Sequence, residues 1–157
     1  MSQPSSPGAV VIDANILISI CSRELSESVA KAALAGYAAQ RWVFYAPSAI
    51  ITEVLFILCQ KLQTGIIDAA KHRKAVEDFS DYMSVIQPPP RGDAALLLRA
   101  EEVRTGYSCL HSADGFYIAL TEELARLREA EFLTFDKRVI NVVTKNAPSV
   151  KVRLLPS

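Results

Sequence analysis

The sequence predicts an α/β fold with a mainly parallel central sheet. Short apolar segments rich in β-branched and aromatic residues occur at 10–18, 42–45 and 132–135, and longer segments with helical apolar spacing separate them. Strands that alternate with helices are typical of a parallel sheet, because each parallel connection needs a crossover. Half of the 157 residues are hydrophobic and 22% are charged, as in an ordinary globular domain.

The chain length suits one domain preceded by a short tail. Residues 1–8 are rich in proline and serine and contain neither a basic residue nor an apolar core, so they do not resemble a signal peptide. We expect a flexible tail over residues 1–8 and a single domain over residues 9–157. The longest uncharged apolar stretch after the first strand, residues 54–59, is far shorter than the ~20 residues that a membrane span needs.

The three cysteines favour a cytoplasmic protein. Cys21, Cys59 and Cys109 form an odd set without the paired spacing of disulfides or zinc sites. Cys21 and Cys59 lie among apolar neighbours, so we expect them to be reduced thiols that act as small core residues. A cytoplasmic location without a membrane partner is the resulting prediction.

The first half of the chain is predicted to contain two strands and three helices. The apolar run at 10–18 predicts a buried central strand, and Ser22 is positioned to cap the helix that follows it. Residues 42–45 predict a second short strand. Two further helices are expected over residues 49–62 and 68–83, and the first of them is almost wholly apolar.

The second half is predicted to continue the alternation of helices and strands. Three consecutive prolines at 88–90 exclude a helix and require an extended connector. The remaining predicted elements are a helix opened by Asp93, a helix capped by Ser112, a buried strand at 132–135, a short helix at 137–143 and an edge strand at 150–154.

Four acidic residues occupy positions that point to a shared site. Asp13 and Asp136 each follow an apolar strand, Glu53 is the only charge before Lys61 in its apolar helix, and Asp114 begins a helix. Ligands of open α/β sheets bind at the carboxyl ends of the strands, where Asp13 is expected. Carboxylate oxygens suit hard cations such as Mg²⁺ or Mn²⁺, and no histidine or cysteine pattern indicates zinc.

Each of these acids also has a simpler structural interpretation. Asp114 in a first turn complements the helix dipole, Asp136 can cap the helix after it, and Asp13 can be a turn residue. Glu53 is the hardest to explain in this way, because a charge in an apolar helix must reach solvent, a cation or a cleft. The four residues therefore predict a metal site as a set, and none of them predicts it alone.

The residues around these acids resemble those of PIN-domain nucleases. The matching segments are VIDANIL at 11–17, Glu53 in its apolar helix, SAD at 112–114 and LTFDKR at 133–138. Successive acids are 40, 61 and 22 residues apart, which is similar to the compact PIN domains of VapC-type toxins. The resemblance extends over residues 10–155, with Gly115 where many relatives have alanine and a looser helix start is therefore expected.

The resemblance implies a PIN-like three-layer α/β/α domain and a metal-dependent endoribonuclease. Asp13, Glu53, Asp114 and Asp136 would then be the metal-binding catalytic acids, with Mg²⁺ or Mn²⁺ as the cofactor. Asn15 and Thr134 would be polar supports that hold these acids. Relatives of this kind cleave RNA, are often paired with a small antitoxin protein and are often dimeric.

Basic residues near the last acid are candidate RNA contacts. Lys137 and Arg138 adjoin Asp136, although the solvent side of a helix explains them nearly as well. The densest basic cluster is Lys71-His72-Arg73-Lys74, which also suits a solvated helix face. The 17 basic and 17 acidic residues cancel, but 17 basic residues face 13 acidic ones if four acids bind a metal. Such a surface attracts phosphate.

Three alternatives to a toxin nuclease remain open at this point. The chain can be a stand-alone RNA-processing PIN nuclease, a DNA-acting PIN nuclease, or a catalytically silent PIN-like binding module. A dinucleotide fingerprint and a P-loop are both absent from the sequence. Phosphatases with an aspartate nucleophile typically carry a second aspartate two residues later, where this chain has Asn15.

Overall fold

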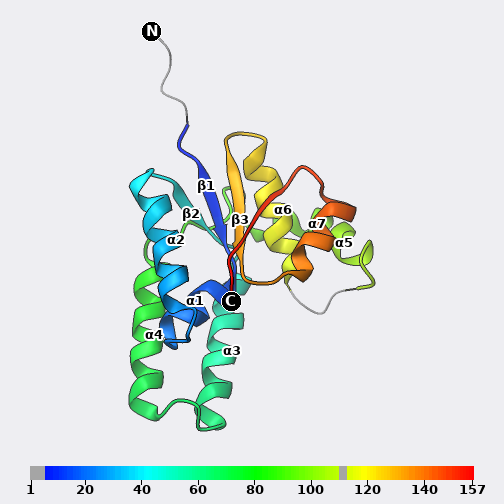
Figure 1. The fold of residues 1–157 in the computed structure, drawn as a ribbon. Coiled ribbons are helices and arrows are strands. Elements are labelled where there is room, and N and C mark those ends of the chain that lie inside the picture. Colours follow the sequence, from blue (N-terminus) through cyan, green and yellow to red (C-terminus); the bar gives the residue numbers. More distant parts are fainter. Residues whose placement is uncertain (1–5, 110–112) are drawn as a thin grey trace.

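A parallel sheet of four strands lies at the centre of the protein (Figure 1). The computed structural model describes residues 6–109 and 113–157. The strands follow the order β2-β1-β3-β4 across the sheet. They are β1 (Ala9–Ile12), β2 (Val43–Tyr45), β3 (Ala130–Thr134) and β4 (Lys151–Leu154). The predicted α/β class with a mainly parallel sheet is confirmed, and β4 is an edge strand as expected.

Helices cover both sides of this sheet and give the predicted three layers. In Figure 1, α2 and α4 lie on one side and α5, α6 and α7 on the other. The helical elements are α1 (Ala14–Cys21), α2 (Glu27–Ala39), α3 (Ala49–Gln63), α4 (Ala69–Met83), the 3₁₀ turn η1 (Asp93–Leu96), α5 (Leu97–Thr105), α6 (Asp114–Ala125) and α7 (Arg138–Asn146). Within the described ranges, no helix combines the length and apolar character of a membrane span.

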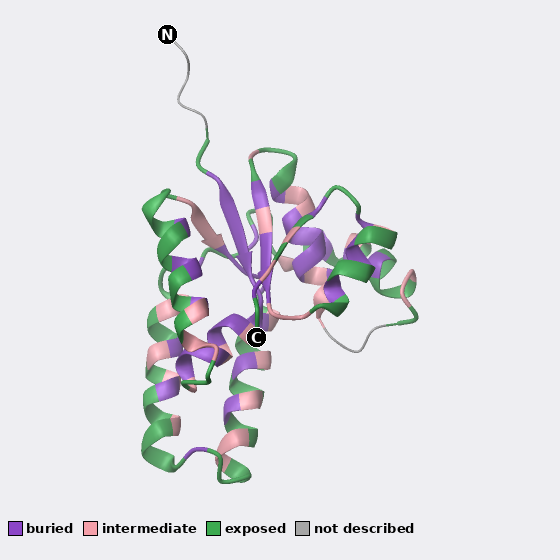
Figure 2. Ribbon diagram, in the orientation of Figure 1, coloured by how far each residue is buried: buried purple, intermediate pink, exposed green. Residues whose placement is uncertain are grey.

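The two central strands form the middle of the core. All four residues of β1 are buried, and Phe132 and Leu133 of β3 are fully inaccessible (Figure 2). Val11 is in register with Phe132, and Ile12 with Leu133. A strand buried on both faces needs apolar residues at successive positions, which is the pattern that predicted β1. The carboxyl ends of β1 and β3 therefore lie side by side.

The first strand is shorter than the apolar run predicts. It ends at Ile12, and α1 begins at Ala14, so the assignment of residues 14–18 to the strand was wrong. The β-branched residues of α1 suit a strand equally well, but Ile16, Leu17 and Ile20 are spaced to form one buried helix face. The strand therefore stops just before Asp13 and turns directly into a helix.

The predicted cap of the second helix was also wrong. Ser22 ends α1, where its hydroxyl donates a hydrogen bond to the Ile18 carbonyl at 2.6 Å. The next helix, α2, begins at Glu27 after Ser26. A serine between two apolar segments can serve either helix end, and the sequence did not reveal α1 as a separate helix.

The later helices agree more closely with the sequence. Asp68 caps α4 by accepting a hydrogen bond from the Lys71 backbone nitrogen at 2.8 Å. The helix predicted from Asp93 starts as the 3₁₀ turn and continues as α5 to Thr105. Ser112, the predicted cap of α6, lies outside the described residues, and the structure assigns the cap position to Ala113.

One of the two cysteines expected in the core is on the surface. Cys21 is buried, whereas Cys59 and Cys109 are exposed, and all three are free thiols. Cys59 lies on α3, which buries only the stripe formed by Ile50, Val54 and Leu58. An almost wholly apolar helix gives no indication of which of its faces is inward, so the sequence placed Cys59 incorrectly.

Candidate active site

Asp13 is a buried carboxylate at the junction of β1 and α1. Its backbone nitrogen donates to the Leu133 carbonyl at 3.0 Å, which fixes Asp13 beside the end of β3. The residue is only 5% exposed. The side-chain atom Oδ2 accepts hydrogen bonds from the Thr134 hydroxyl at 2.6 Å and from Asn15 Nδ2 at 3.2 Å. The carboxylate is thus oriented by polar neighbours on two different elements.

The Thr134 hydroxyl connects the polar residues at this end of the sheet. Besides donating to Asp13, it accepts hydrogen bonds from Asn15 Nδ2 at 3.2 Å and from the Asp136 backbone nitrogen at 3.0 Å. Asn15 Oδ1 in turn accepts a hydrogen bond from the Phe135 backbone nitrogen at 3.3 Å. Thr134 is fully buried. One hydroxyl therefore links the start of α1, the end of β3 and the turn that leads to α7.

Glu53 meets a tyrosine from a different helix. The Tyr117 hydroxyl, on α6, donates a hydrogen bond to Glu53 Oε1, on α3, at 2.9 Å. Tyr117 is fully buried, and its ring stacks on Phe132 with centroids 5.6 Å apart. Tyr117 was not among the site residues predicted from the sequence. The available signal was a tyrosine one turn after Asp114, because a buried tyrosine hydroxyl usually has a partner.

Three of the four predicted acids interact electrostatically. Burial, opposed by the hydrogen bond from Thr134 and reinforced by the Asp114 and Glu53 carboxylates, raises the pKa of Asp13 to about 7. Burial also raises the pKa of Glu53, and the Asp114 carboxylate adds to that shift. Because all three prefer not to be charged together, their common site favours a cation.

Asp136 is held differently from the other three acids. It accepts a hydrogen bond at 2.9 Å from the backbone nitrogen of Arg138, the first residue of α7, whereas the cap position of this helix belongs to Lys137. Its Oδ2 atom also pairs with the Arg138 guanidinium at 2.8 Å, which lowers the pKa of Asp136. The Asp136 carboxylate raises the pKa of Arg138 and the Asp114 carboxylate adds to the shift, so this guanidinium lies within electrostatic range of both acids.

The donor set of this region suits a hard divalent cation. The donor set consists of carboxylate oxygens, which hydroxyl and amide groups support. Mg²⁺ and Mn²⁺ sites in proteins are built from oxygen ligands of this kind. Among residues 6–109 and 113–157, no three histidine, cysteine, aspartate or glutamate side chains form a group that could hold a metal as they stand. The acids therefore fit an ion by their chemistry and their mutual repulsion.

The basic candidates lie at the surface. Lys137 and Arg138 are exposed, and the Arg138 side chain retains 84% of its accessible area despite its ion pair. In the cluster at 71–74, Lys74 pairs with Asp78 at 2.6 Å along α4.

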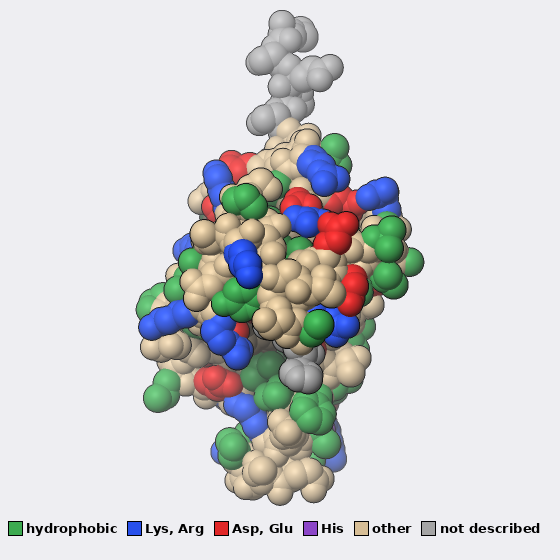
Figure 3. All heavy atoms as spheres, turned by 90° about the vertical axis from the view of Figure 1, so that its right-hand side faces the viewer, with side chains coloured by type: hydrophobic (Ala, Val, Ile, Leu, Met, Phe, Trp, Pro, Cys, Tyr) green, Lys and Arg blue, Asp and Glu red, His purple; other side chains and the backbone are tan. Residues whose placement is uncertain are grey.

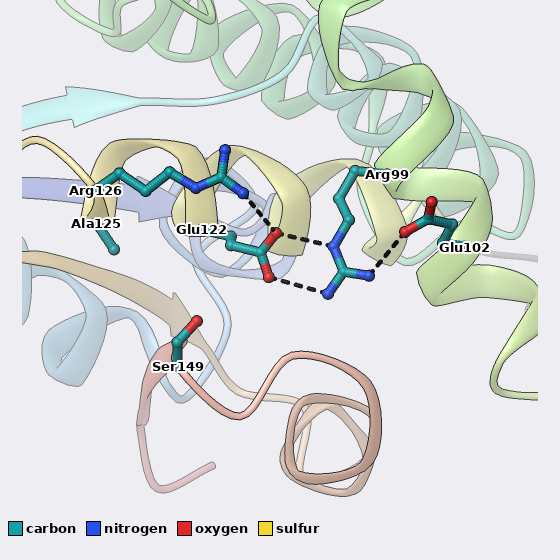
Figure 4. A pocket seen from close by; sticks show the side chains of 6 residues that line it. All are labelled: Arg99, Glu102, Glu122, Ala125, Arg126 and Ser149. Carbon is teal, nitrogen blue, oxygen red and sulfur yellow. Dashed lines mark hydrogen bonds and ion pairs between the residues drawn. The ribbon is translucent and has the colours of Figure 1, made fainter.

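A pocket apart from the acid site is lined by charged side chains that pair with one another. Arg99 of α5 bonds Glu122 of α6, Glu102 and the Asn146 carbonyl, and Arg126 adds a further contact to Glu122 (Figure 4). On the surrounding face, basic and acidic side chains are intermixed and form no patch of a single sign (Figure 3). These charges hold α5, α6 and the end of α7 together, and we assign them a structural role.

Comparisons with known proteins agree with this architecture. The sequence model of the PIN domain family matches residues 10–145. Among solved structures, the crystal structure of VapBC2 from Rickettsia felis, bound to a DNA fragment from the VapBC2 promoter, contains a chain with a similar fold. The TM-score is 0.63 at 10% identity, over 94% of this chain and 98% of that chain. No curated protein sequence matches the chain. Because the family match spans most of its length, the chain belongs to the PIN domain family.

Proposed function

We propose that the protein is a divalent-metal-dependent endoribonuclease, and that it is the toxin of a toxin–antitoxin pair. The observation that carries this proposal is the convergence of Asp13, Glu53 and Asp114, whose carboxylates repel one another beside the ends of β1 and β3. Membership of the PIN domain family, whose members are nucleases, supports hydrolysis of a phosphodiester. The similarity in fold to a VapBC2 chain supports the toxin role.

In this proposal the four acids hold one or two Mg²⁺ or Mn²⁺ ions. When bound, such an ion lowers the pKa of water and neutralises charge on the phosphate that is attacked. The chain supplies orientation: Thr134 and Asn15 fix the Asp13 carboxylate, and Tyr117 fixes that of Glu53. Burial keeps Asp13 away from bulk water, which strengthens its interaction with a cation.

Lys137 and Arg138 are the proposed contacts to the RNA backbone. Both are exposed at the start of α7, immediately after Asp136. A guanidinium forms paired hydrogen bonds to phosphate oxygens as well as to carboxylates. Arg138 can therefore exchange its contact with Asp136 for a contact with the substrate when an ion neutralises that carboxylate.

The proposed protein partners are a small antitoxin and a second copy of the chain. The proposal of an antitoxin partner is supported by the similarity in fold to a chain of the VapBC2 structure. A homodimer is supported by the outer side of α3, where Ile51, Leu55 and Phe56 are exposed. We further propose a single functional domain over residues 9–157 and a cytoplasmic location.

Cleavage of nucleic acids by the purified protein tests the proposed function. A mixed single-stranded RNA and a single-stranded DNA of the same sequence are incubated with the protein, with Mn²⁺ or Mg²⁺ and with EDTA. We expect RNA to be cut in the presence of either ion and to stay intact in EDTA. Cleavage of DNA alone would favour a DNA-acting nuclease. Inactivity on several RNAs, in a preparation shown to be free of antitoxin, would favour the binding module.

A further inference from the structure

Among the described residues, side-chain donors contact a single oxygen in each of two carboxylates of the acid site. Glu53 accepts the Tyr117 hydroxyl at Oε1, and Asp13 accepts both Thr134 and Asn15 at Oδ2. Among the described residues, Tyr117 is the one side chain that donates a hydrogen bond to Glu53. The hydroxyl therefore marks one oxygen of Glu53 as already engaged by the protein.

Tyr117 is firmly placed to keep this contact. It is fully buried, lies one helical turn after Asp114 on α6, and stacks on Phe132 of β3 at an interplanar angle of 25°. Burial raises the pKa of its hydroxyl, and the neighbouring Glu53 and Asp13 carboxylates raise it further, so the group remains a donor at working pH. A buried donor is costly to leave without an acceptor, so the Tyr117 hydroxyl keeps its hydrogen bond to Oε1 when an ion binds.

This arrangement bears on the choice of metal. Mg²⁺ takes near-octahedral coordination from single oxygens and retained waters, whereas Ca²⁺ takes six to eight oxygens and often binds a carboxylate through both. A glutamate with one oxygen occupied serves the first kind of ion better than the second. We propose that Tyr117 is a positioning residue that limits Glu53 to one metal-binding oxygen and makes the site select Mg²⁺ or Mn²⁺ over Ca²⁺. This inference rests on the metal site of the proposed function.

The Tyr117→Phe variant of the full chain tests the inference. It removes the hydroxyl and keeps the ring that stacks on Phe132. Tyr37→Phe is the matched control, because Tyr37 is also buried and donates to a carboxylate, that of Glu131 near the start of β3. Calorimetric titrations with Mn²⁺ and with Ca²⁺, at one pH, give the ratio of the two dissociation constants for each protein.

We expect Tyr117→Phe to shift this ratio toward Ca²⁺ by about tenfold, which is the lower end of effects seen for groups that orient metal ligands. Tyr37→Phe should leave the ratio as in the wild type. Equal weakening of both ions, or no change in the ratio, would overturn the selectivity role while leaving the proposed nuclease intact. Failure of the wild type to bind Mn²⁺ would overturn the metal site itself, and this inference with it.

Infrared spectra of the wild type supply a readout that does not depend on the folding of Tyr117→Phe. Carboxylate stretching bands differ between binding through one oxygen and through two, and the difference spectrum against Glu53→Gln isolates the bands of Glu53. We expect the one-oxygen pattern with Mn²⁺ and also with Ca²⁺. A two-oxygen pattern for Glu53 when Ca²⁺ binds the wild type would contradict the proposal.

Discussion

The Thr134 hydroxyl donates a 2.6 Å hydrogen bond to Asp13 Oδ2, although 121 residues separate the two in the sequence. The contact joins the carboxyl ends of the two central strands. It places a buried carboxylate where parallel α/β sheets bind their ligands, and fixes which of its oxygens faces the protein. The geometry of the acid site thus depends on a hydroxyl that carries no charge.

Replacing Thr134 by valine should therefore impair both stability and activity. The variant leaves Asp13 Oδ2 and the Asp136 backbone nitrogen without this partner. We expect a loss of about 1–3 kcal/mol in the free energy of unfolding, as for other unsatisfied buried polar groups. Metal-dependent cleavage should fall as well. Thr134→Ser keeps the hydroxyl and should retain most activity, and equal activity in Thr134→Val and Thr134→Ser would refute the orienting role.

Without metal, the protein should become less stable as the pH rises from about 4 to 7. Because burial and the neighbouring acids raise the pKa of Asp13 to about 7, the folded state binds a proton that the unfolded state has already lost. The free energy of unfolding should fall by up to about 1.4 kcal/mol per pH unit in this range and level off above it. The raised pKa of Glu53 acts in the same direction.

Denaturant unfolding in EDTA across this pH range measures the effect, with Asp13→Asn as the comparison. The variant cannot take up the proton, so its stability should depend less on pH than that of the wild type. Parallel pH profiles for wild type and variant would show that Asp13 does not titrate in this way.

Gly115 allows α5 and α6 to approach closely at the acid site. A Cβ atom there would lie 2.5 Å from the Ala100 carbonyl oxygen, which is too close for any side chain. Gly115 is buried against the backbone of α5, and the looser helix start expected from the sequence stays a prediction. The residue also follows Asp114 directly, so its backbone helps to place that carboxylate.

Gly115→Ala should destabilise the protein by about 1–3 kcal/mol, as other overpacking substitutions do. Gly36→Ala is the matched control, because an added Cβ at this exposed position of α2 has no atom within 4 Å. Better helix propensity should make that variant more stable by about 0.5–1 kcal/mol. Thermal and denaturant unfolding measure both changes. Stabilisation by Gly115→Ala would mean that the helices can separate at little cost.

Arg138→Gln should weaken substrate binding more than catalytic turnover. The guanidinium is exposed and lies near Asp136 and Asp114, where an RNA phosphate would approach the acids. We expect KM to rise several-fold and the salt dependence of RNA binding to decrease by about one phosphate contact. Arg104→Gln removes another exposed arginine, paired with Glu101 on α5, and should change neither. A fall in kcat alone would assign Arg138 to the chemical step.

The sequence predicted the parallel sheet and most helices because their apolar patterns are distinct. It failed where two structures share one pattern. The run after Asp13 suits a strand and a helix alike, and only the contacts of Ile16 and Leu17 in the folded core decide between them. The same limit applies to α3, whose inward stripe cannot be identified in an almost wholly apolar segment.

The candidate site was predictable in its acids and less so in its supports. Asp13 and Glu53 are conspicuous as charges beside apolar residues. The sequence around Tyr117, in contrast, predicts only an aromatic residue of the core. Its role depends on a contact between α6 and α3 across 64 residues, which no local pattern reveals. The pairing of Asp136 with Arg138 likewise depends on side-chain direction at the start of α7.

The most direct test of the account compares RNA cleavage by Asp13→Asn with cleavage by Asp78→Asn, each against the wild type in Mn²⁺. Both changes replace one carboxylate by an amide of the same shape, but Asp78 pairs with Lys74 on α4, apart from the acid site. We expect Asp13→Asn to cut no faster than the wild type does in EDTA, whereas Asp78→Asn should cut at the wild-type rate. Metal-dependent cleavage that survives Asp13→Asn undiminished would contradict the claim that this acid site is catalytic.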